Sequence, residues 1–299
     1  MTGCFYGTVN FAEDWGGSDT KTSARDYDIF ITKINVDGTY GWTRRMGGTD
    51  GCSAYSICTD AAGNVYVAGY FQSSSVNFAE DWGGSDTKTN AGYWDIFVTK
   101  INANGTYGWT RRMGGTSDDV AYSICTDASG NVYVAGRFGG TVNFAEDWGG
   151  NDTKTNGGGF VTRINADGRY AWTRRMGGQD IDGVNAICTD EGGNIYVAGA
   201  FYETFVNFAE DWSGLDIKVT AGGWDVFITK ITANGSYIWT HTMGGIDDDG
   251  VSGICADGSG NIYVAGYFQS TVNFAQDWGG SDAKTSAGSL DMFITKIGQ

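Results

Sequence analysis

The stretch that decides the fold is residues 119–148, which read Asp119-Val-Ala-Tyr-Ser-Ile-Cys-Thr-Asp-Ala-Ser-Gly-Asn-Val-Tyr-Val-Ala-Gly-Arg-Phe-Gly-Gly-Thr-Val-Asn-Phe-Ala-Glu-Asp-Trp148. Two runs rich in β-branched and aromatic residues flank an Asp-Ala-Ser-Gly-Asn segment. Such runs favour strands, and a cluster of Asp, Ser, Gly and Asn between them favours a tight turn. The stretch therefore predicts two antiparallel strands, followed by a polar excursion that opens at Trp148.

Near-copies of this stretch fill the rest of the chain. The heptad Val-Asn-Phe-Ala-Glu-Asp-Trp starts at Val9, Val76, Val142, Val206 and Val272. These starts lie 67, 66, 64 and 66 residues apart, and Gln276 replaces Glu in the last copy. Self-similarity at a fixed period is typical of repeat architectures, and no linker interrupts it. We therefore predict a single domain over residues 1–299, with repeat units of approximately 1–48, 49–115, 116–178, 179–245 and 246–299.

Each unit carries four strand-like runs. Residues 96–101 are apolar on both faces of a strand, which indicates burial on both sides of its sheet. The Asn-Ala-Asn-Gly that follows is a hairpin signal, and no window shows the 3.6-residue period of a helix. Four short antiparallel strands per unit predict an all-β fold, a β-propeller of four-stranded antiparallel blades.

The order of the runs predicts how the blades are arranged. With the Ser-Ile-Cys-Thr-Asp strand innermost, the chain gives five blades, of which the first lacks its inner strand and the last its outer strand. A ring of five is favoured, and a fragment of a larger ring is the alternative. The repeat exceeds the roughly 40–50 residues of a usual blade. The excess is an excursion, about residues 12–25 in the first unit, predicted between the second and third strands as one long rim loop per blade.

Residues 95–136 carry a resemblance to a known family. They contain, in order, Asp-Ile-Phe-Val-Thr-Lys-Ile-Asn-Ala-Asn-Gly, Trp-Thr, Met-Gly-Gly-Thr-Ser-Asp-Asp-Val-Ala-Tyr-Ser-Ile and Asp-Ala-Ser-Gly-Asn-Val-Tyr-Val-Ala-Gly. This pattern resembles the repeat of the SBBP (seven-bladed β-propeller) family and recurs over nearly the whole chain. The resemblance implies a propeller and an extracytoplasmic bacterial or archaeal setting. It implies no catalytic residues, because the family is defined by its fold.

Composition excludes some classes of partner. Gly is 49 of 299 residues and Pro is absent, which fits a chain full of tight turns. A net charge of -16 and a pI of about 4.3 leave nothing to neutralise phosphates, so we expect no nucleic-acid partner. No apolar run approaches the roughly 18 residues of a membrane span, so we expect no membrane insertion. No signal peptide is visible at the N-terminus, although the chain could be the mature part of a secreted precursor.

One tryptophan opens each excursion, and these residues are candidate ligand-binding groups. They are Trp15, Trp82, Trp148, Trp212 and Trp278. An exposed Trp beside Asp and Gly offers a sugar a flat apolar face and placed polar groups. The alternative is that each Trp anchors its own loop to its blade. The tryptophans of the fourth strand are predicted to be core residues.

Carboxylates recur in each excursion and are candidate calcium ligands. They are Asp14, Asp19, Asp81, Asp86, Asp147, Asp152, Asp211, Asp216, Asp277 and Asp282. Calcium takes six to eight oxygen ligands, several of which an acidic, Gly-rich loop could supply. No EF-hand or nonapeptide spacing is present. The alternative is that these carboxylates cap turns and solubilise the rim. The sequence requires no cofactor, and calcium is the one candidate.

Cysteine spacing gives no zinc or redox motif. One cysteine per unit lies on the inner strand and is predicted to be a small buried hydrophobe; these are Cys58, Cys125, Cys188 and Cys255. Cys4 and Cys52 are irregular, and a disulfide between them is a guess. Cys52 stands where other units have Asp119, Asp182 and Asp249.

Paired arginines end the fourth strand in three units, as in Arg111-Arg112, and are predicted to pair with neighbouring carboxylates. His241 is the only histidine, so a Ser-His-Asp arrangement cannot recur across the blades. Near-identical repeats also spread chemistry evenly, whereas a catalytic site usually needs one copy to differ. We therefore predict that the chain is not an enzyme.

These features predict a non-enzymatic β-propeller, extracellular or at a cell surface, that acts as a binding, adhesion or assembly scaffold through its repeated rim loops. Its partner would be a protein or a glycan. The alternative is a multivalent carbohydrate-binding lectin with one site per blade, in which weak sites gain avidity. A propeller hydrolase or lyase would need clustered acids on the axis. The incomplete terminal blades leave strand edges that could also support self-assembly.

Overall fold

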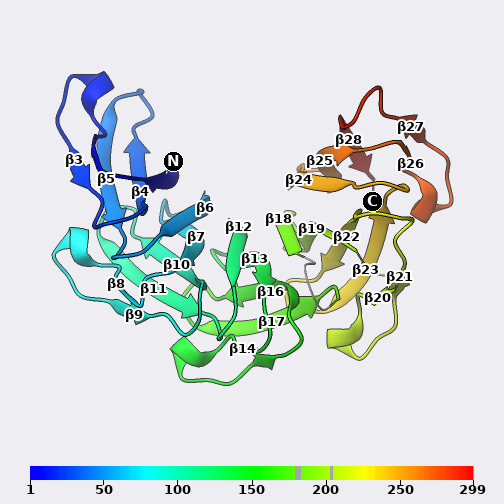
Figure 1. Cartoon of the computed structure of the whole chain (residues 1–299), viewed down its shortest axis with the longest axis horizontal. Helices are drawn as coiled ribbons and strands as arrows, with labels where there is room; N and C mark the ends of the chain where they lie inside the picture. Colours follow the sequence, from blue (N-terminus) through cyan, green and yellow to red (C-terminus); the bar gives the residue numbers. More distant parts are fainter. Residues whose placement is uncertain (179–182, 203–204, 299) are drawn as a thin grey trace.

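The computed structural model describes residues 1–178, 183–202 and 205–298. The chain forms five antiparallel sheets, the blades, which follow one another along an open arc (Figure 1). The helices in these ranges are single 3₁₀ turns, and none has the length and apolarity needed to cross a membrane. The predicted all-β propeller fold is confirmed.

Three blades are complete, with strands a to d in chain order across the sheet. Blade 2 consists of β6 (Cys52–Thr59), β7 (Val65–Phe71), β10 (Asp95–Ile101) and β11 (Tyr107–Met113). Blade 3 consists of β12 (Val120–Thr126), β13 (Val132–Phe138), β16 (Gly158–Ile164) and β17 (Tyr170–Met176). Blade 4 consists of β18 (Gly183–Thr189), β19 (Ile195–Phe201), β22 (Asp225–Ile231) and β23 (Tyr237–Met243). Strands a of neighbouring blades contact one another, so strand a is innermost, as predicted.

The two end blades have three strands each. Blade 1 has strands b to d, which are β1 (Thr2–Phe5), β4 (Asp28–Ile34) and β5 (Tyr40–Met46). Blade 5 has strands a to c, which are β24 (Gly250–Ala256), β25 (Ile262–Phe268) and β28 (Asp291–Ile297). This is the predicted order. The favoured closed ring of five is not formed, because the four blade-to-blade steps turn the chain through less than a full circle and leave blades 1 and 5 apart (Figure 1).

The excursion of each unit is a small hairpin between strands b and c, where it was predicted. Each hairpin has two strands. From blade 1 to blade 5 the pairs are β2 (Thr8–Asn10) with β3 (Thr20–Thr22); β8 (Ser75–Asn77) with β9 (Thr87–Thr89); β14 (Val142–Asn143) with β15 (Thr153–Lys154); β20 (Val206–Asn207) with β21 (Ile217–Lys218); and β26 (Thr271–Asn273) with β27 (Ala283–Thr285). Between them lies the 3₁₀ turn η1 (Glu13–Trp15), η2 (Glu80–Trp82), η3 (Glu146–Trp148), η4 (Glu210–Trp212) or η5 (Gln276–Trp278). Each turn ends on a residue in the left-handed region, Gly in four units and Ser213 in blade 4.

The core lies between successive blades and includes the hairpins. Ile96 and Val98 of blade 2 pack against blade 3, where the hairpin residue Phe144 lies between Phe138 and Phe160. The ring centroid of Phe144 is 5.2 Å from that of Phe138 and 5.0 Å from that of Phe160. Turns η2 to η5 each contact strand d of the preceding blade. The hairpins therefore fill the outer space between blades that diverge from the axis, rather than projecting freely from a rim.

The inner strands carry the regular cysteines and a shared irregularity. Cys58, Cys125 and Cys188 pack against the inter-blade cores but are half-buried rather than buried as predicted, and Cys255 is exposed. The suggested disulfide between Cys4 and Cys52 is wrong, since both thiols are free and belong to different sheets. Each inner strand also contains a β-bulge at the same position. The bulged residues are Tyr55, Tyr122, Asn185 and Ser252.

Candidate functional site

Four of the five hairpin tryptophans, all but Trp278, are hydrogen-bonded to their own blade. In blade 2, Trp82 Nε1 donates to Gly105 O at 2.9 Å, and the indole lies 5.4 Å from the ring of Tyr107. Gly105 belongs to the turn between strands c and d, so this bond holds the hairpin along the outer edge. Trp15, Trp148 and Trp212 make the same bond to Gly38, Gly168 and Gly235 at 2.8, 2.9 and 2.5 Å.

The preceding blade covers some of these indole rings. The Arg111 guanidinium carbon lies 5.1 Å from the Trp148 ring centroid, and Arg44 and Arg174 lie 5.5 Å from Trp82 and Trp212. Trp278 instead stacks on His241, with ring centroids 4.4 Å apart. These contacts give the hairpin tryptophans an anchoring role. The prediction that they bind a ligand stays a prediction.

In blades 2 to 5, the first aspartate of the hairpin links the blade to the preceding one, whereas Asp14 of blade 1 has no preceding blade to pair with among the described residues. Lys88 of one hairpin donates to Asp147 of the next at 3.0 Å. The same step joins Lys21 to Asp81, Lys154 to Asp211 and Lys218 to Asp277, at 3.0, 3.1 and 3.0 Å. Arginines at the end of strand d add ion pairs, as in Arg112 with Asp95 and Glu146 at 2.6 Å each. The predicted pairing of these arginines with neighbouring carboxylates is confirmed.

The second carboxylate of each hairpin is bound within its own blade. Asp86 accepts hydrogen bonds from the Tyr107 hydroxyl at 2.7 Å and the Thr110 N–H at 3.1 Å, and pairs with Lys88 at 3.2 Å. Burial raises the pKa of Asp86, but these donors together hold it below its usual value. Asp19, Asp152 and Asp216 have equivalent partners. The described residues contain no group of three or more His, Cys, Asp or Glu side chains that could hold a metal ion. Calcium binding by the hairpins stays a prediction.

A hollow of about 540 Å³ opens at the inner side of blades 3 to 5, and we call it the inner hollow. It is lined by Tyr122, Arg137, Gly183, Asn185, Ala200, Trp224, Asp248, Asp249 and Tyr267. Three kinds of position supply most of these side chains: the bulge of strand a, the residue next to last in strand b, and the residue before strand c. The bulge matters because it releases one residue per inner strand from the regular alternation of faces.

These three kinds of position differ strongly between the repeats. The bulge residues are Tyr55, Tyr122, Asn185 and Ser252; the strand b residues are Cys4, Tyr70, Arg137, Ala200 and Tyr267; and the residues before strand c are Tyr27, Trp94, Gly157, Trp224 and Leu290. The hairpin heptads, in contrast, are nearly identical. These inner-side positions therefore vary between otherwise similar units, and six of them line the inner hollow: Tyr122, Arg137, Asn185, Ala200, Trp224 and Tyr267.

Polar groups in the inner hollow are fixed in place. Arg137 Nε donates to the Tyr122 hydroxyl at 2.8 Å, and Asp248 Oδ1 accepts from the Trp224 N–H at 3.1 Å. Asp249 is buried and accepts the N–H groups of Gly245 and Gln269 at 2.7 and 3.0 Å. Arg137 forms no ion pair with a carboxylate among the described residues. The hollow thus offers aromatic faces, one guanidinium and several acceptors on a rigid frame.

An aromatic strip continues from the inner hollow toward blade 2. The rings of Tyr55 and Tyr122 lie 5.8 Å apart, Tyr55 lies 5.8 Å from Tyr70, and Tyr70 lies 4.8 Å from Trp94. Tyr55 is 52% exposed. The sequence signal for this site is the set of positions that differ between aligned repeats. The repeated motifs, from which the candidate residues were predicted, lie in the hairpins instead.

The carboxylate that precedes strand a of blade 3, Asp119, has a raised pKa. Asp119 accepts the N–H groups of Gly115 and Gly139 at 2.7 and 3.0 Å. Burial nevertheless raises the pKa of Asp119 to about 7. Asp249 is the equivalent residue in blade 5, Cys52 replaces it in blade 2, and Asp182 lies outside the described residues. Through these two hydrogen bonds, Asp119 joins the segment between blades 2 and 3, at Gly115, to the residue that follows strand b, Gly139.

Comparison with known proteins agrees with this architecture. Residues 108–137 match the model of the SBBP family, described as a beta-propeller repeat. The predicted resemblance is confirmed. The chain is 26% identical over 292 residues to "Regulatory protein FlaEY" of Caulobacter vibrioides, covering 90% of this chain and 28% of that protein. It is 24% identical over 278 residues to "Uncharacterized WD repeat-containing protein L264" of Acanthamoeba polyphaga mimivirus, covering 80% of this chain and 20% of that protein. The chain thus spans less than a third of either relative.

Among solved structures, the chain resembles a protein of unknown function from Bacteroides caccae at 14% identity. The match covers 72% of this chain and 77% of that chain, with a TM-score of 0.26. A likeness of this size supports no conclusion about fold or function.

Proposed function

We propose that this chain is a non-enzymatic propeller module, outside the cell or at a cell surface, that binds a protein or glycan partner at the inner hollow. The observation that carries this proposal is where the repeats differ. The hairpins of blades 2 to 4 make the same contacts to their neighbours, and the shared hairpin sequence supplies those contacts. The residues around the hollow are free of that constraint, and the three different sets of side chains that blades 3 to 5 supply there can recognise one asymmetric partner.

Two further observations support the non-enzymatic and extracellular parts of the proposal. The single histidine, His241, is engaged with Asp277 at 3.1 Å and stacks on Trp278, so it is already used structurally. The resemblance to the SBBP repeat implies an extracytoplasmic setting. The regulatory role in the printed name of one relative belongs to a protein of which this chain covers 28%, and it adds no activity here.

A carbohydrate ligand is the second candidate. The inner hollow brings Trp224, Tyr122 and Tyr267 together with an amide from Asn185 and a carboxylate from Asp248. Sugars are recognised by this combination of aromatic faces and a few placed polar groups. A lectin with one site on each hairpin is less well supported, because arginines cover the indoles of Trp82, Trp148 and Trp212.

A glycan array tests both candidates, with the unmodified chain compared with Trp224→Ala and with Trp15→Ala as the control. Trp15 is an exposed hairpin tryptophan of blade 1, outside the inner hollow. We expect Trp224→Ala to abolish any selective glycan signal and Trp15→Ala to leave it unchanged. The reverse result would place the ligand on the hairpins. A blank array would leave a protein partner, which photo-crosslinking from position 185 would then identify.

A further inference from the structure

The arginine near the end of strand d has the same two kinds of partner in blades 1 and 2. In blade 2, Arg112 donates to the buried carboxylate of Asp95 and to Glu146 of the next hairpin, at 2.6 Å each. The equivalent contacts in blade 1 are those of Arg45 to Asp28 and Glu80, at 2.6 and 2.9 Å. Each guanidinium group thus bridges a carboxylate buried at the start of strand c and an exposed carboxylate of the following hairpin.

Blade 4 keeps the backbone of this site but not the guanidinium group. Thr242 takes the place of Arg112 in the same register, since each lies opposite the phenylalanine at the third position of strand c. The Thr242 N–H donates to Asp277 of the next hairpin at 3.0 Å, and the Arg112 N–H makes the equivalent bond at 3.4 Å. Strand d therefore lies in the same place in both blades, and only its side chain is shorter in blade 4.

A pocket of about 60 Å³ lies beside Thr242, and we call it the blade 4 pocket. A water molecule needs at least about 10–15 Å³, so this pocket has room for several waters or for one planar guanidinium group. Gln276 and Val219 line it and are exposed, so the pocket reaches the surface of the molecule. Its polar side chains come from Asp225, Thr242, Asn273, Gln276 and Asp277.

The buried carboxylate in this pocket lacks a cation. Asp225 is 3% exposed, and within the described ranges it forms no ion pair. Its Oδ2 accepts only the Ala221 N–H, at 2.8 Å, whereas Asp95 Oδ2 accepts both the Ala91 N–H at 2.9 Å and Arg112 at 2.6 Å. The other oxygen, Oδ1, is buried without a partner in both blades. Burial raises the pKa of Asp225 to about 6, as expected for a buried carboxylate without a partner charge.

The other acceptors around the pocket favour a guanidinium group over a metal ion. Asp277 is already paired with Lys218 and His241, at 3.0 and 3.1 Å. Gln276 stands where the preceding hairpins have Glu, and its side-chain carbonyl still accepts hydrogen bonds. Calcium takes six to eight oxygen ligands, and no group of three or more His, Cys, Asp or Glu side chains in the described part of the chain could hold a metal ion.

We propose that the blade 4 pocket binds a guanidinium group from another molecule, supplied by an arginine of a partner protein or by a free guanidino compound. One N–H group donates to Asp225 Oδ2 and a second donates to the side-chain carbonyl of Gln276, in the manner of Arg112 in blade 2. A guanidinium group suits this place because its donors lie in one rigid plane and can serve both acceptors at once. The proposal does not depend on the partner proposed for the inner hollow.

Two backbone amides give matched reporters of binding. The Ala221 N–H donates to Asp225 in the open pocket, and the Ala91 N–H donates to Asp95 in the site that Arg112 fills. NMR of the full isotope-labelled chain, titrated with methylguanidinium chloride, follows both signals. We expect a saturable shift of the Ala221 signal with a Kd on the order of 1 mM, and none of the Ala91 signal. Methylammonium chloride and calcium chloride at equal ionic strength should not reproduce the shift.

Variants of the chain locate the site. Asp225→Asn keeps the size of the side chain but removes its charge, and it should weaken binding of methylguanidinium about tenfold or more. Thr242→Arg fills the pocket with a guanidinium group of this chain and should abolish binding. Gln276→Glu restores the second carboxylate and should tighten binding about threefold; because Gln276 is exposed, this variant tests the proposal even where a core variant does not fold. Arg112→Thr is the matched positive control, since it opens the same site in blade 2 and should make the Ala91 signal respond.

A short arginine peptide and a free guanidino compound distinguish the two sources. The peptide is acetyl-Gly-Arg-Gly-amide, with acetyl-Gly-Lys-Gly-amide as its control, and the compound is agmatine. Tighter binding of the arginine peptide than of agmatine supports an arginine of a partner protein, and the reverse order supports a small ligand.

Three results would overturn the proposal. The first is the absence of a saturable Ala221 shift with methylguanidinium. The second is an equal response of Ala91 in the unmodified chain, or the same Ala221 shift with methylammonium. The third is binding that neither Asp225→Asn nor Thr242→Arg weakens, since the ligand would then occupy another place.

Discussion

The hairpins of blades 2 and 5 have nearly the same sequence but different surroundings. In blade 2 the hairpin lies against its own strand d and against Arg44 and Lys21 of blade 1. The described residues of blade 5 contain no strand d, and the hairpin keeps the contacts to blade 4 through Lys218 and His241. The side chain of its second carboxylate is correspondingly more exposed, 55% for Asp282 against 25% for Asp86.

The comparison teaches that the long excursion is a structural part of the blade. The same residues that form a closed network in blade 2 form an open groove in blade 5. Their role is therefore decided by which strands surround them. Four predictions test whether matched residues in different blades have different roles, from the largest expected effect to the smallest.

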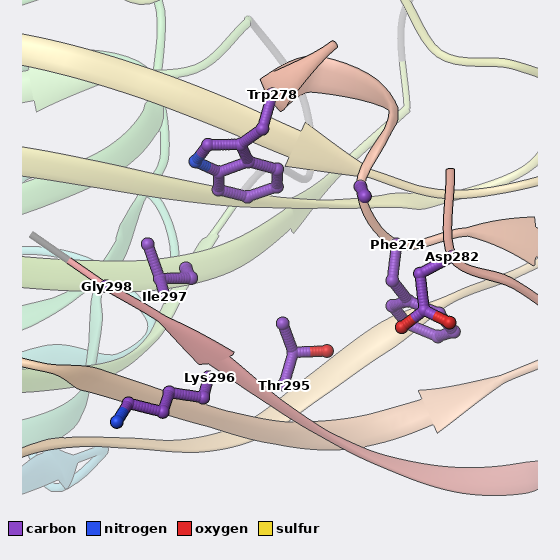
Figure 2. A pocket seen from close by; sticks show the side chains of 8 residues that line it. Phe274, Trp278, Asp282, Thr295, Lys296, Ile297 and Gly298 are labelled. Atoms are coloured by element: carbon purple, nitrogen blue, oxygen red, sulfur yellow. The ribbon is translucent and has the colours of Figure 1, made fainter. Parts of the chain in front are cut away.

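The hairpin phenylalanine should matter most in a complete blade. Phe144 is fully buried between Phe138 and Phe160, so Phe144→Ala should lower the free energy of unfolding by about 3–5 kcal/mol. The matched variant Phe274→Ala in blade 5 lies at a groove of about 210 Å³ between the hairpin and β28 (Figure 2). It should cost roughly half as much. Urea unfolding followed by tryptophan fluorescence measures both. Equal losses would contradict the difference between the two blades.

The second carboxylate should show the next largest contrast. Asp86→Ala leaves the Tyr107 hydroxyl and the Thr110 N–H without their acceptor and should cost about 2–4 kcal/mol, because hydrogen bonds to charged groups are the stronger ones. Asp282→Ala removes an exposed pair with Lys284 and should change the unfolding free energy by less than about 0.5 kcal/mol. Thermal and urea unfolding compare the two. A large loss in Asp282→Ala would show that the open hairpin depends on its carboxylate after all.

Blade 4 allows a test of pH dependence. Blades 1 and 2 pair a buried Asp with Arg45 or Arg112, which also reaches Glu80 or Glu146. In blade 4, Thr242 replaces the Arg, and the hairpin of blade 5 has Gln276 in place of the Glu. Burial raises the pKa of Asp225 to about 6. A raised carboxyl pKa means that the folded state holds its proton longer, so stability from this group falls as the pH rises from about 4 to about 6.

Thr242→Arg should supply the missing partner and lower the pKa of Asp225. We expect a gain on the order of 2 kcal/mol above pH 6 and little gain at pH 4, because one pKa unit corresponds to about 1.4 kcal/mol. Unfolding curves between pH 4 and pH 8 measure it, with Thr242→Met as the uncharged control of similar length. A gain of the same size at both pH values would show that packing, not charge, is responsible.

The lysine link between hairpins should give the smallest effect. Lys88 has a 12% exposed side chain and joins Asp147 of the next blade, so Lys88→Met should cost about 1 kcal/mol, and less in high salt. Lys284→Met breaks an exposed pair within one hairpin and should be nearly neutral. Unfolding at low and high ionic strength checks both. The idea of a blade-to-blade link fails if the two variants behave alike.

Much of the architecture followed from the sequence alone. Strand-forming runs, Asp-x-x-Gly-Asn turns and the 66-residue repeat are local signals, so they predicted the strands, their order within each blade, the incomplete end blades and the position of the excursion. The replacement of Asp119 by Cys52, and the loss of the Arg from blade 4 and of its Glu partner from the hairpin of blade 5, are also visible as differences between aligned repeats.

The tertiary structure decided what those elements do. Lys21 and Asp81 are separated by 60 residues, and their pairing depends on how one blade lies against the next, which no local pattern specifies. The same angle between blades leaves the arc open and places the bulged residues around the inner hollow. Repeats determine a blade because its strands pair within one unit. The curvature of the arc and the covered tryptophans arise only from contacts between units.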